Sequence, residues 1–160
     1  MNLLVFEANL HDPTHASGLV DVLDAYACDP KGGGQPLPAD VKDRLVPALI
    51  EHPASLVLLA SVDEQIVGTA TCFLGFSTFQ ARPLLNVHDL AVIPEYRGRG
   101  IGRALLACAE ASALARGCCK LTLEVQDDNP KARGLYTSFG FENFVVGDSA
   151  PTRFMAKPIP

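Results

Sequence analysis

The sequence predicts a single domain over residues 1–160, of the α/β (α+β) class, in which helices cover a mixed β-sheet. Three observations lead to this prediction. The 160 residues are 48% hydrophobic, which suffices for one continuous core. Two β-type segments joined at Asp63 and Glu64 indicate an antiparallel hairpin in the first half. In the second half strands alternate with helices, and that alternation indicates parallel pairing.

The N-terminal half is expected to contain a strand, two helices and a hairpin. Its first helix carries Leu19, Val22, Leu23 and Tyr26 at helical spacing. Glycines and prolines exclude regular structure from Asp29–Pro38, which is either a flexible connector or a loop that faces the substrate. The expected elements are 2–8, Pro13–Cys28, Ala39–Glu51, Ser55–Val62 and Gln65–Phe76.

The C-terminal half is expected to alternate strands with helices and to end in two closing strands. Apolar residues dominate its first helix, which begins at Gly100. The closing strands would offer an apolar edge to a second copy, so a homodimer is expected. The expected elements are Leu84–Ile93, Gly100–Arg116, Lys120–Gln126, Pro130–Phe139, Glu142–Val146 and Thr152–Ala156.

Composition and charge narrow the class of protein. No stretch approaches the about 18 uncharged apolar residues that a membrane span needs. The first residues include Glu7 and Asp12 and do not resemble a secretion signal, so a soluble, cytoplasmic protein without a membrane partner is expected. The net charge of −5 argues against a nucleic-acid partner, because binding phosphates requires clustered Lys and Arg. A cationic substrate would suit this charge.

Neither the cysteines nor the histidines predict a metal site. The five cysteines lack CxxC spacing, which favours buried thiols over ligands or disulfides. The four histidines are isolated from one another and from carboxylate pairs at ligand spacing. These residues are Cys28, Cys72, Cys108, Cys118 and Cys119, and His11, His15, His52 and His88.

The most specific feature of the sequence is a glycine-dense turn between a strand that stops at Pro94 and an apolar helix. Alternating glycines let a ligand approach the backbone closely, and successive amides at a helix start attract an anion. Arginines within and after the turn add cationic side chains. The segment consists of Arg97, Gly98, Arg99, Gly100, Ile101, Gly102 and Arg103.

The spacing of this turn excludes two common nucleotide sites. A P-loop requires Gly, four residues and then Gly-Lys-Ser/Thr, and the chain has no such string. A dinucleotide fingerprint requires GxGxxG, but counting from Gly98 and Gly100 the third position is Arg103. The remaining alternative to an anion site is a structural turn that packs the strand closely against the helix.

The turn resembles the (Gln/Arg)-x-x-Gly-x-(Gly/Ala) signature of the GCN5-related N-acetyltransferase (GNAT) superfamily. Downstream, Asn129, Ala132, Tyr136 and the pair Gly140-Phe141 are similar to the family's Asn, Ala, Tyr and Gly-Phe segment. The expected order of elements extends the resemblance over essentially the whole chain. It implies a GNAT-type sheet, mostly antiparallel and twisted, with a splayed parallel strand pair that holds CoA.

The resemblance also implies where acetyl-CoA binds. The thioester would lie between the strands Leu84–Ile93 and Lys120–Gln126, with the pantetheine paired to the backbone of the former. The pyrophosphate would lie on the amides of the glycine turn. The expected cofactor-binding residues are Leu90, Ala91, Val92, Arg97, Gly98, Arg99, Gly100, Ile101, Gly102, Arg103, Asn129, Ala132 and Tyr136.

Tyr136 is the expected general acid. The resemblance places a tyrosine close to the thioester sulfur, where a phenol can protonate the departing thiolate. The alternative is a core tyrosine whose hydroxyl is satisfied elsewhere. Asn129 has two possible uses as well, because it can bind the pantetheine or cap the helix that follows.

The segment Asn86–Val92 contains the candidates for the general base. It resembles the Leu-Glu-Asp-Leu string of diamine and polyamine acetyltransferases, with His88 at the glutamate position and Asp89 at the aspartate position. Histidine suits proton removal near neutrality, directly or through a water, and His88 is the preferred base. Strand alternation predicts that the two side chains point to opposite faces of the sheet. A purely structural role for both stays open.

The leading prediction is therefore an acetyl-CoA-dependent N-acetyltransferase of the EC 2.3.1 type. It would transfer the acetyl group to the primary amine of a small molecule by direct attack. The alternatives are acetylation of a protein lysine or N-terminus, a longer acyl donor, and a noncatalytic acyl-CoA-binding sensor. No metal is implied.

Overall fold

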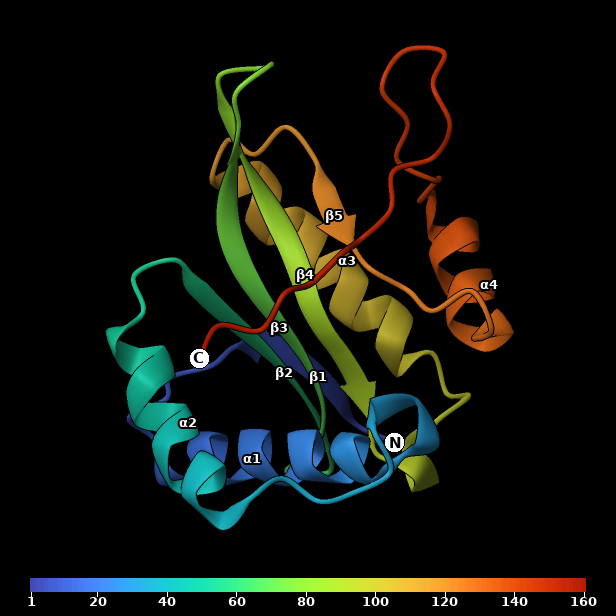
Figure 1. Ribbon diagram of the computed structural model, residues 1–160. Helices are drawn as coiled ribbons and strands as arrows, with labels where there is room; N and C mark the ends of the chain where they lie inside the picture. The colour runs from blue at the N-terminus through green and yellow to red at the C-terminus, as the bar shows by residue number, and fades with distance from the viewer. The chain divides into compact units, whose positions relative to one another are not determined.

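The computed structural model describes residues 1–160 and consists of two compact units, Met1–Leu123 and Glu124–Pro160 (Figure 1). The first unit contains the sheet and three of the four α-helices, and the second contains α4. The elements of the first unit are β1 (Leu3–Glu7), α1 (Pro13–Cys28), η1 (Pro30–Gly32), α2 (Ala39–Glu51), β2 (Ser55–Val62), β3 (Gln65–Ser77), β4 (Arg82–Val92), η2 (Pro94–Tyr96), α3 (Ile101–Ala115) and β5 (Leu121–Leu123).

The sheet has the mixed, mostly antiparallel architecture that the sequence predicts. Its strand order is β1-β2-β3-β4-β5. The first three pairings are antiparallel, and β4 pairs with β5 in parallel. Figure 1 shows α1 and α2 on one side of the sheet and α3 on the other. The prediction of the fold class is thus confirmed.

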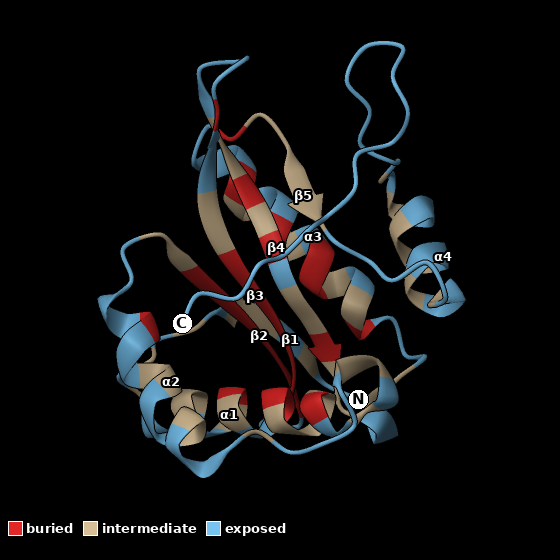
Figure 2. Ribbon diagram, in the orientation of Figure 1, coloured by how far each residue is buried: buried red, intermediate tan, exposed pale blue.

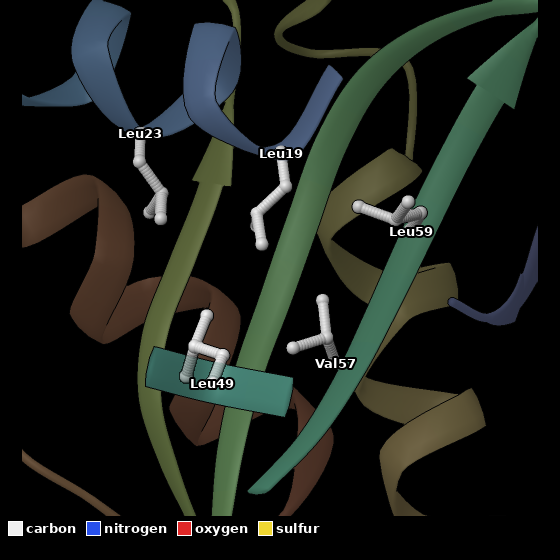
Figure 3. Close-up of a cluster of buried hydrophobic side chains, with 5 residues drawn as sticks. All are labelled: Leu19, Leu23, Leu49, Val57 and Leu59. Atoms are coloured by element: carbon white, nitrogen blue, oxygen red, sulfur yellow. The ribbon is translucent and has the colours of Figure 1, made fainter. Parts of the chain in front are cut away.

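The core between α1, α2 and the sheet follows directly from the apolar spacing of the sequence. Leu19 and Leu23 lie one turn apart on α1 and meet Leu49 of α2 over Val57 and Leu59, alternate residues of β2 (Figure 3). All five are buried, and each such side chain contributes roughly 1.5–3 kcal/mol by leaving water. Figure 2 shows that burial is concentrated along β2 and β3 and on the inner sides of α1 and α3.

On the opposite face, α3 approaches the sheet closely at a glycine. A Cβ at Gly68 would lie 3.1 Å from the carbonyl oxygen of Ala91, 3.3 Å from Leu105 Cδ1 and 3.4 Å from Ile101 Cγ2. A larger residue would therefore push α3 away from β3 and β4. Since Ile101 starts α3, this packing also fixes where the helix begins.

The parallel pair β4–β5 is shorter than the sequence predicts. Pairing covers Leu85↔Leu121, Asn86↔Thr122 and Val87↔Leu123, while β4 continues for five more residues. The expected strand Lys120–Gln126 is therefore wrong in extent, because residues after Leu123 have no register partner on β4. Beyond Val87 the edge of β4 has no partner on β5, and the splayed strand pair that the resemblance implies stays a prediction.

In the second unit, α4 (Pro130–Phe139) has well-defined ends. The Asn129 side chain accepts a hydrogen bond from the backbone N–H of Ala132 at 3.2 Å, and Pro130 occupies the first helical position. At the other end Gly140 has a φ of +111°, and its N–H and that of Phe141 both donate to the carbonyl of Tyr136.

The predicted closing strands, Glu142–Val146 and Thr152–Ala156, are wrong. The segment after α4 contains no strand, although Thr152 N donates to Phe144 O at 2.9 Å. That contact does not belong to a strand. The alternating apolar residues there are largely exposed.

Candidate active site

The glycine turn that follows β4 has the backbone geometry of an anion site. Gly98 and Gly100 have φ values of +74° and +80°, a region that glycine adopts without strain. A Cβ built at either position would meet no atom within 4 Å, so the turn is open at both glycines. A structural glycine needed for tight packing would instead show close contacts, as Gly68 does.

The start of α3 leaves several amides without an acceptor in the helix. The first intrahelical hydrogen bond runs from Ala104 N to Gly100 O at 3.0 Å, so the N–H groups of Ile101, Gly102 and Arg103 precede the hydrogen-bonded turns. Gly100 supplies no side-chain cap, and no acidic residue lies in the first turn. A pyrophosphate fits this arrangement, because the amides and the helix dipole both favour negative charge.

Two arginines of the turn are already bonded within the protein. Arg97 donates from Nε to Val92 O at 2.8 Å and from Nη1 to Asp29 Oδ2 at 2.8 Å. Arg99 donates to Glu95 O at 3.0 Å, and its guanidinium lies 5.0 Å from the centre of the Tyr96 ring. The Arg97 side chain therefore holds neighbouring segments together, whereas exposed Arg99 needs to leave only one carbonyl and one ring to reach a phosphate.

The loop Asp29–Pro38 is anchored at both ends, which does not fit a flexible connector. It contains the 3-10 helix η1, so the prediction that this segment has no regular structure is wrong at Pro30–Gly32. Asp29 accepts from Lys31 N and pairs with Arg97, and these two hydrogen bonds, in that order, lower the pKa of its carboxyl. At the far end Leu37 N donates to Asp24 Oδ1 at 2.8 Å, and Lys42 Nζ lies 2.6 Å from Asp24 Oδ2. The loop is thereby connected to the glycine turn and to α1.

A β-bulge in β4 changes the predicted directions of the candidate bases. Thr71 pairs with Asp89 but Cys72 pairs with Val87, so His88 is an extra residue in the strand. Asp89 therefore shares the sheet face of Thr71 and of Val57, its partner on β2 in the α1–α2 core. The prediction that strand alternation places His88 and Asp89 on opposite faces is wrong, because the bulge interrupts the alternation.

His88 lies on this same face. Its ring is 5.6 Å from that of Phe73 at an interplanar angle of 77°, and Phe73 packs against the α1–α2 core. The ring of His52, just after α2, also contacts the Phe73 ring, with 5.2 Å between the ring centres. The imidazole of His88 is exposed, so it can exchange a proton with a bound amine or with water.

Asp89 lies deeper than His88. Burial raises the pKa of its carboxyl, and the neighbouring His88 acts in the opposite direction. Tyr26, in the last turn of α1, interacts electrostatically with this carboxyl. Burial, Asp89 and Asp29 together raise the pKa of its phenol. The sequence assigned Tyr26 only to the apolar pattern of α1, and its proximity to Asp89 depends on packing that no spacing reveals.

The end of β4 offers backbone to an extended ligand. Leu90, Ala91 and Val92 pair with β3 through Ala70, Thr69 and Gly68. The parallel pairing of β4 with β5 has already ended at Val87. Val92 O accepts from Arg97, so the carbonyls and amides nearer the bulge are the ones suited to an amide-containing chain such as pantetheine.

The second unit carries the expected acid and its neighbours. Tyr136 is half-buried on α4, and its ring lies 5.9 Å from that of Phe141 in an edge-on contact. Asn129 caps α4 through Ala132 N, so this alternative use of the asparagine is observed. The roles of Asn129, Ala132 and Tyr136 toward CoA stay predictions.

The described residues contain neither a cluster of metal ligands nor a helix that could span a membrane. No three His, Cys, Asp or Glu side chains come together in a way that would hold a metal ion. None of the helices is both long and apolar enough to cross a membrane.

Comparisons with solved structures bear out the fold. An integron cassette protein from V. cholerae superimposes with a TM-score of 0.78 at 23% identity, over 98% of this chain and 94% of that one. A ribosomal-protein-alanine N-acetyltransferase from Brucella melitensis biovar Abortus gives 0.72 at 22% identity, over 96% and 100%. An aminoglycoside acetyltransferase from an uncultured soil metagenomic sample, in complex with sisomicin, gives 0.75 at 18% identity, over 94% and 97%.

A family model decides the classification. The model described as "Acetyltransferase (GNAT) family" matches residues 19–141, which span most of the chain and include the glycine turn, the bulge of β4 and Tyr136. The resemblance recognised in the sequence is thereby confirmed. The chain belongs to the acetyltransferase (GNAT) family.

Proposed function

We propose that this protein transfers an acetyl group from acetyl-CoA to the primary amine of a small molecule. The observation that carries the proposal is the joint arrangement at the end of β4. An open glycine turn at a helix start lies beyond the end of β4, whose bulge directs His88 and Asp89 to one face. One strand thus connects a site for a pyrophosphate with groups that can accept a proton.

Binding of acetyl-CoA would use mainly the backbone. The amides of Gly98 to Arg103 would receive the pyrophosphate, with Arg99 and Arg103 as charged neighbours. The backbone of Leu90 to Val92 would pair with the pantetheine amides. Acetyl-CoA supplies a thioester whose carbonyl carbon accepts the attacking nitrogen.

The chemistry requires two proton transfers. As the amine nitrogen forms a bond to the carbonyl carbon, His88 removes a proton from it, and the C–S bond then breaks. Tyr136 donates its phenolic proton to the departing thiolate. A carboxyl on the same face, that of Asp89, gives the amine side a charge that attracts a cationic acceptor, in keeping with the net charge of −5.

We further propose that the protein is cytoplasmic and works as a homodimer without a metal. Support for a dimer comes from exposed apolar side chains in the last segment of the chain, including Phe144, Val146 and Phe154. Sedimentation of the purified protein tests this directly, since a monomer at micromolar concentration would contradict the dimer.

The decisive experiment measures free thiol release from acetyl-CoA with a panel of small amines, aminoglycosides, lysine peptides and N-terminal peptides. The proposal expects saturable, amine-dependent release with at least one small amine, and an acetylated product of the corresponding mass. Release only with peptides would replace it by protein acetylation. Binding of CoA without release for any acceptor would identify a noncatalytic sensor and contradict the proposal.

A further inference from the structure

One buried polar group at the bulge has no partner in the protein. Thr71 is 3% exposed, and no protein group donates to or accepts from its Oγ1. Its neighbour two residues away on β3 behaves differently, since Thr69 Oγ1 donates to Leu58 O at 3.0 Å. Because an unpaired buried hydroxyl costs about 1–3 kcal/mol, the hydroxyl of Thr71 indicates a partner that is not a protein group, such as a water.

The register of the sheet shows which residues lie beside Thr71 on the neighbouring strands. Val57, Thr71 and Asp89 form one cross-strand row on the α1–α2 face, with Thr71 in the middle. Val57 is apolar and belongs to the core, so it offers Thr71 nothing to bond. Directly paired residues bring their Cβ atoms to about 4.5–5.5 Å, and since the two side chains do not bond directly, one water can bridge the hydroxyl and the carboxyl.

We propose that Thr71 is a positioning residue for Asp89, and that its hydroxyl hydrogen-bonds the Asp89 carboxylate through one water. The bond would stabilise the ionised carboxylate and fix its orientation beside the extra residue, His88. Its relevance to catalysis rests on the proposed function, but the bond itself does not. Thr71 would then orient the Asp89 carboxylate of the amine site from the neighbouring strand β3.

The proposal makes a signed prediction for stability. Burial raises the pKa of Asp89 in the folded protein, so the contribution of this carboxyl to stability is greatest below the ordinary carboxyl range and falls as pH rises through the folded pKa. A hydrogen bond from Thr71 opposes this loss only when Asp89 is ionised. The other titratable groups that sense Asp89 are His88 on β4, Tyr26 on α1 and Cys72 on β3.

A double-mutant cycle separates this bond from packing. Unfolding free energies of wild type, Thr71→Val, Asp89→Asn and the double variant are compared at about pH 4 and about pH 7, without CoA or amine. Valine keeps the shape of threonine and removes the hydroxyl. We expect Thr71→Val to be as stable as wild type or more stable near pH 4, and less stable near pH 7. This pH dependence should vanish in the Asp89→Asn background, which retains His88.

Two further variants serve as controls. Thr71→Ser keeps the hydroxyl and should keep the wild-type pH dependence. Thr69→Val removes a hydroxyl that bonds a carbonyl and should destabilise equally at both pH values. A Thr71→Val protein that is stabilised equally at both pH values would overturn the proposal, because its hydroxyl would then be merely unsatisfied.

The kinetic arm links the bond to the reaction. With an amine that the wild type acetylates, Thr71→Val should lower kcat/KM by about 10-fold, while Thr71→Ser restores it and the Kd for CoA is unchanged. Full activity in a Thr71→Val protein that shows the expected pH-dependent instability would overturn the catalytic relevance. If no amine is acetylated by wild type, the proposed function fails, and the stability cycle still decides the Thr71–Asp89 bond.

Discussion

The glycine turn and the bulge of β4 lie near the end of the same strand, yet the turn is built from backbone groups and the bulge site from side chains. The turn is a backbone structure, in which Gly98 and Gly100 have positive φ values and open space around them. The bulge is a side-chain site, where half-buried Asp89 pairs with buried Thr71 and follows exposed His88. One region binds through amides that every residue has, and the other depends on which side chain each residue carries.

This difference separates binding from chemistry. A substitution in the turn should affect CoA affinity and leave proton transfer intact. A substitution at the bulge should alter the pH dependence or rate and leave CoA affinity intact. Substitutions in both regions and at Tyr136 test that separation, in order of decreasing effect.

The largest effect is expected for Gly100→Asp, which adds a side chain and a negative charge to the turn. CoA affinity should fall by more than about 100-fold, because several amide contacts are lost and phosphate is repelled. Calorimetry measures the affinity, and circular dichroism checks the fold. Gly117→Asp is the matched control, since Gly117 has a φ of +71° and open space but lies after α3. Equal affinity in folded Gly100→Asp and Gly117→Asp proteins would remove the turn as the CoA site.

Tyr136→Phe should have the largest effect on the chemical step. The phenyl ring preserves the contact with Phe141, so only the hydroxyl is lost. We expect kcat to fall by about 10- to 1000-fold with little change in the Kd for acetyl-CoA, as for loss of a general acid. Stopped-flow and equilibrium measurements separate the two quantities. A fully active variant would leave the thiolate without an identified proton donor.

The choice between His88 and Asp89 rests on the pH profile. If His88 is the base, kcat/KM of wild type should rise with pH through the range in which imidazole ionises, provided that the amine titrates well above it. His88→Ala should remove or displace this limb, whereas Asp89→Asn should preserve it and weaken a cationic acceptor. The opposite pattern would transfer the role of base to Asp89, whose pKa burial raises.

Arg99→Ala should give the smallest of these effects. To bind phosphate, its guanidinium must give up its contacts with Glu95 O and the Tyr96 ring. The gain in binding free energy is therefore only the difference between the new contacts and the lost ones. We expect CoA to bind about 10-fold more weakly, with a smaller loss for pantetheine derivatives that lack the phosphates. Arg44→Ala, which removes an exposed arginine paired with Asp40 on α2, controls for overall charge. Equal losses for both ligands would show that Arg99 does not pair with phosphate.

The two regions also differ in how far the sequence predicts them. The turn depends on glycine spacing, so the string from Arg97 to Gly102 is enough to indicate it. The bulge depends on register between strands, and one extra residue at position 88 reverses the predicted direction of Asp89. Thr71 and Tyr26 become visible as neighbours of Asp89 only when β3 and α1 are packed on β4.

The remaining errors have a related cause. The sequence predicts the four α-helices to within one residue, because their caps and periodicity are local features, but it misses the short 3-10 helices η1 and η2. Strands require a partner edge that no local pattern supplies. For this reason β5 stops at Leu123, and the apolar alternation around Phe144 and Phe154 does not form strands.

Binding of CoA on the backbone of the glycine turn is the central claim. Titration of the ¹⁵N-labelled protein with CoA, followed by amide chemical shifts, tests this claim most directly because it reports each N–H separately. We predict saturable shifts that are largest for the amides of Gly98, Gly100, Ile101 and Gly102, with smaller changes at Leu90 and Ala91. Absence of saturable binding, or saturable shifts that leave these turn amides unchanged, would contradict the claim.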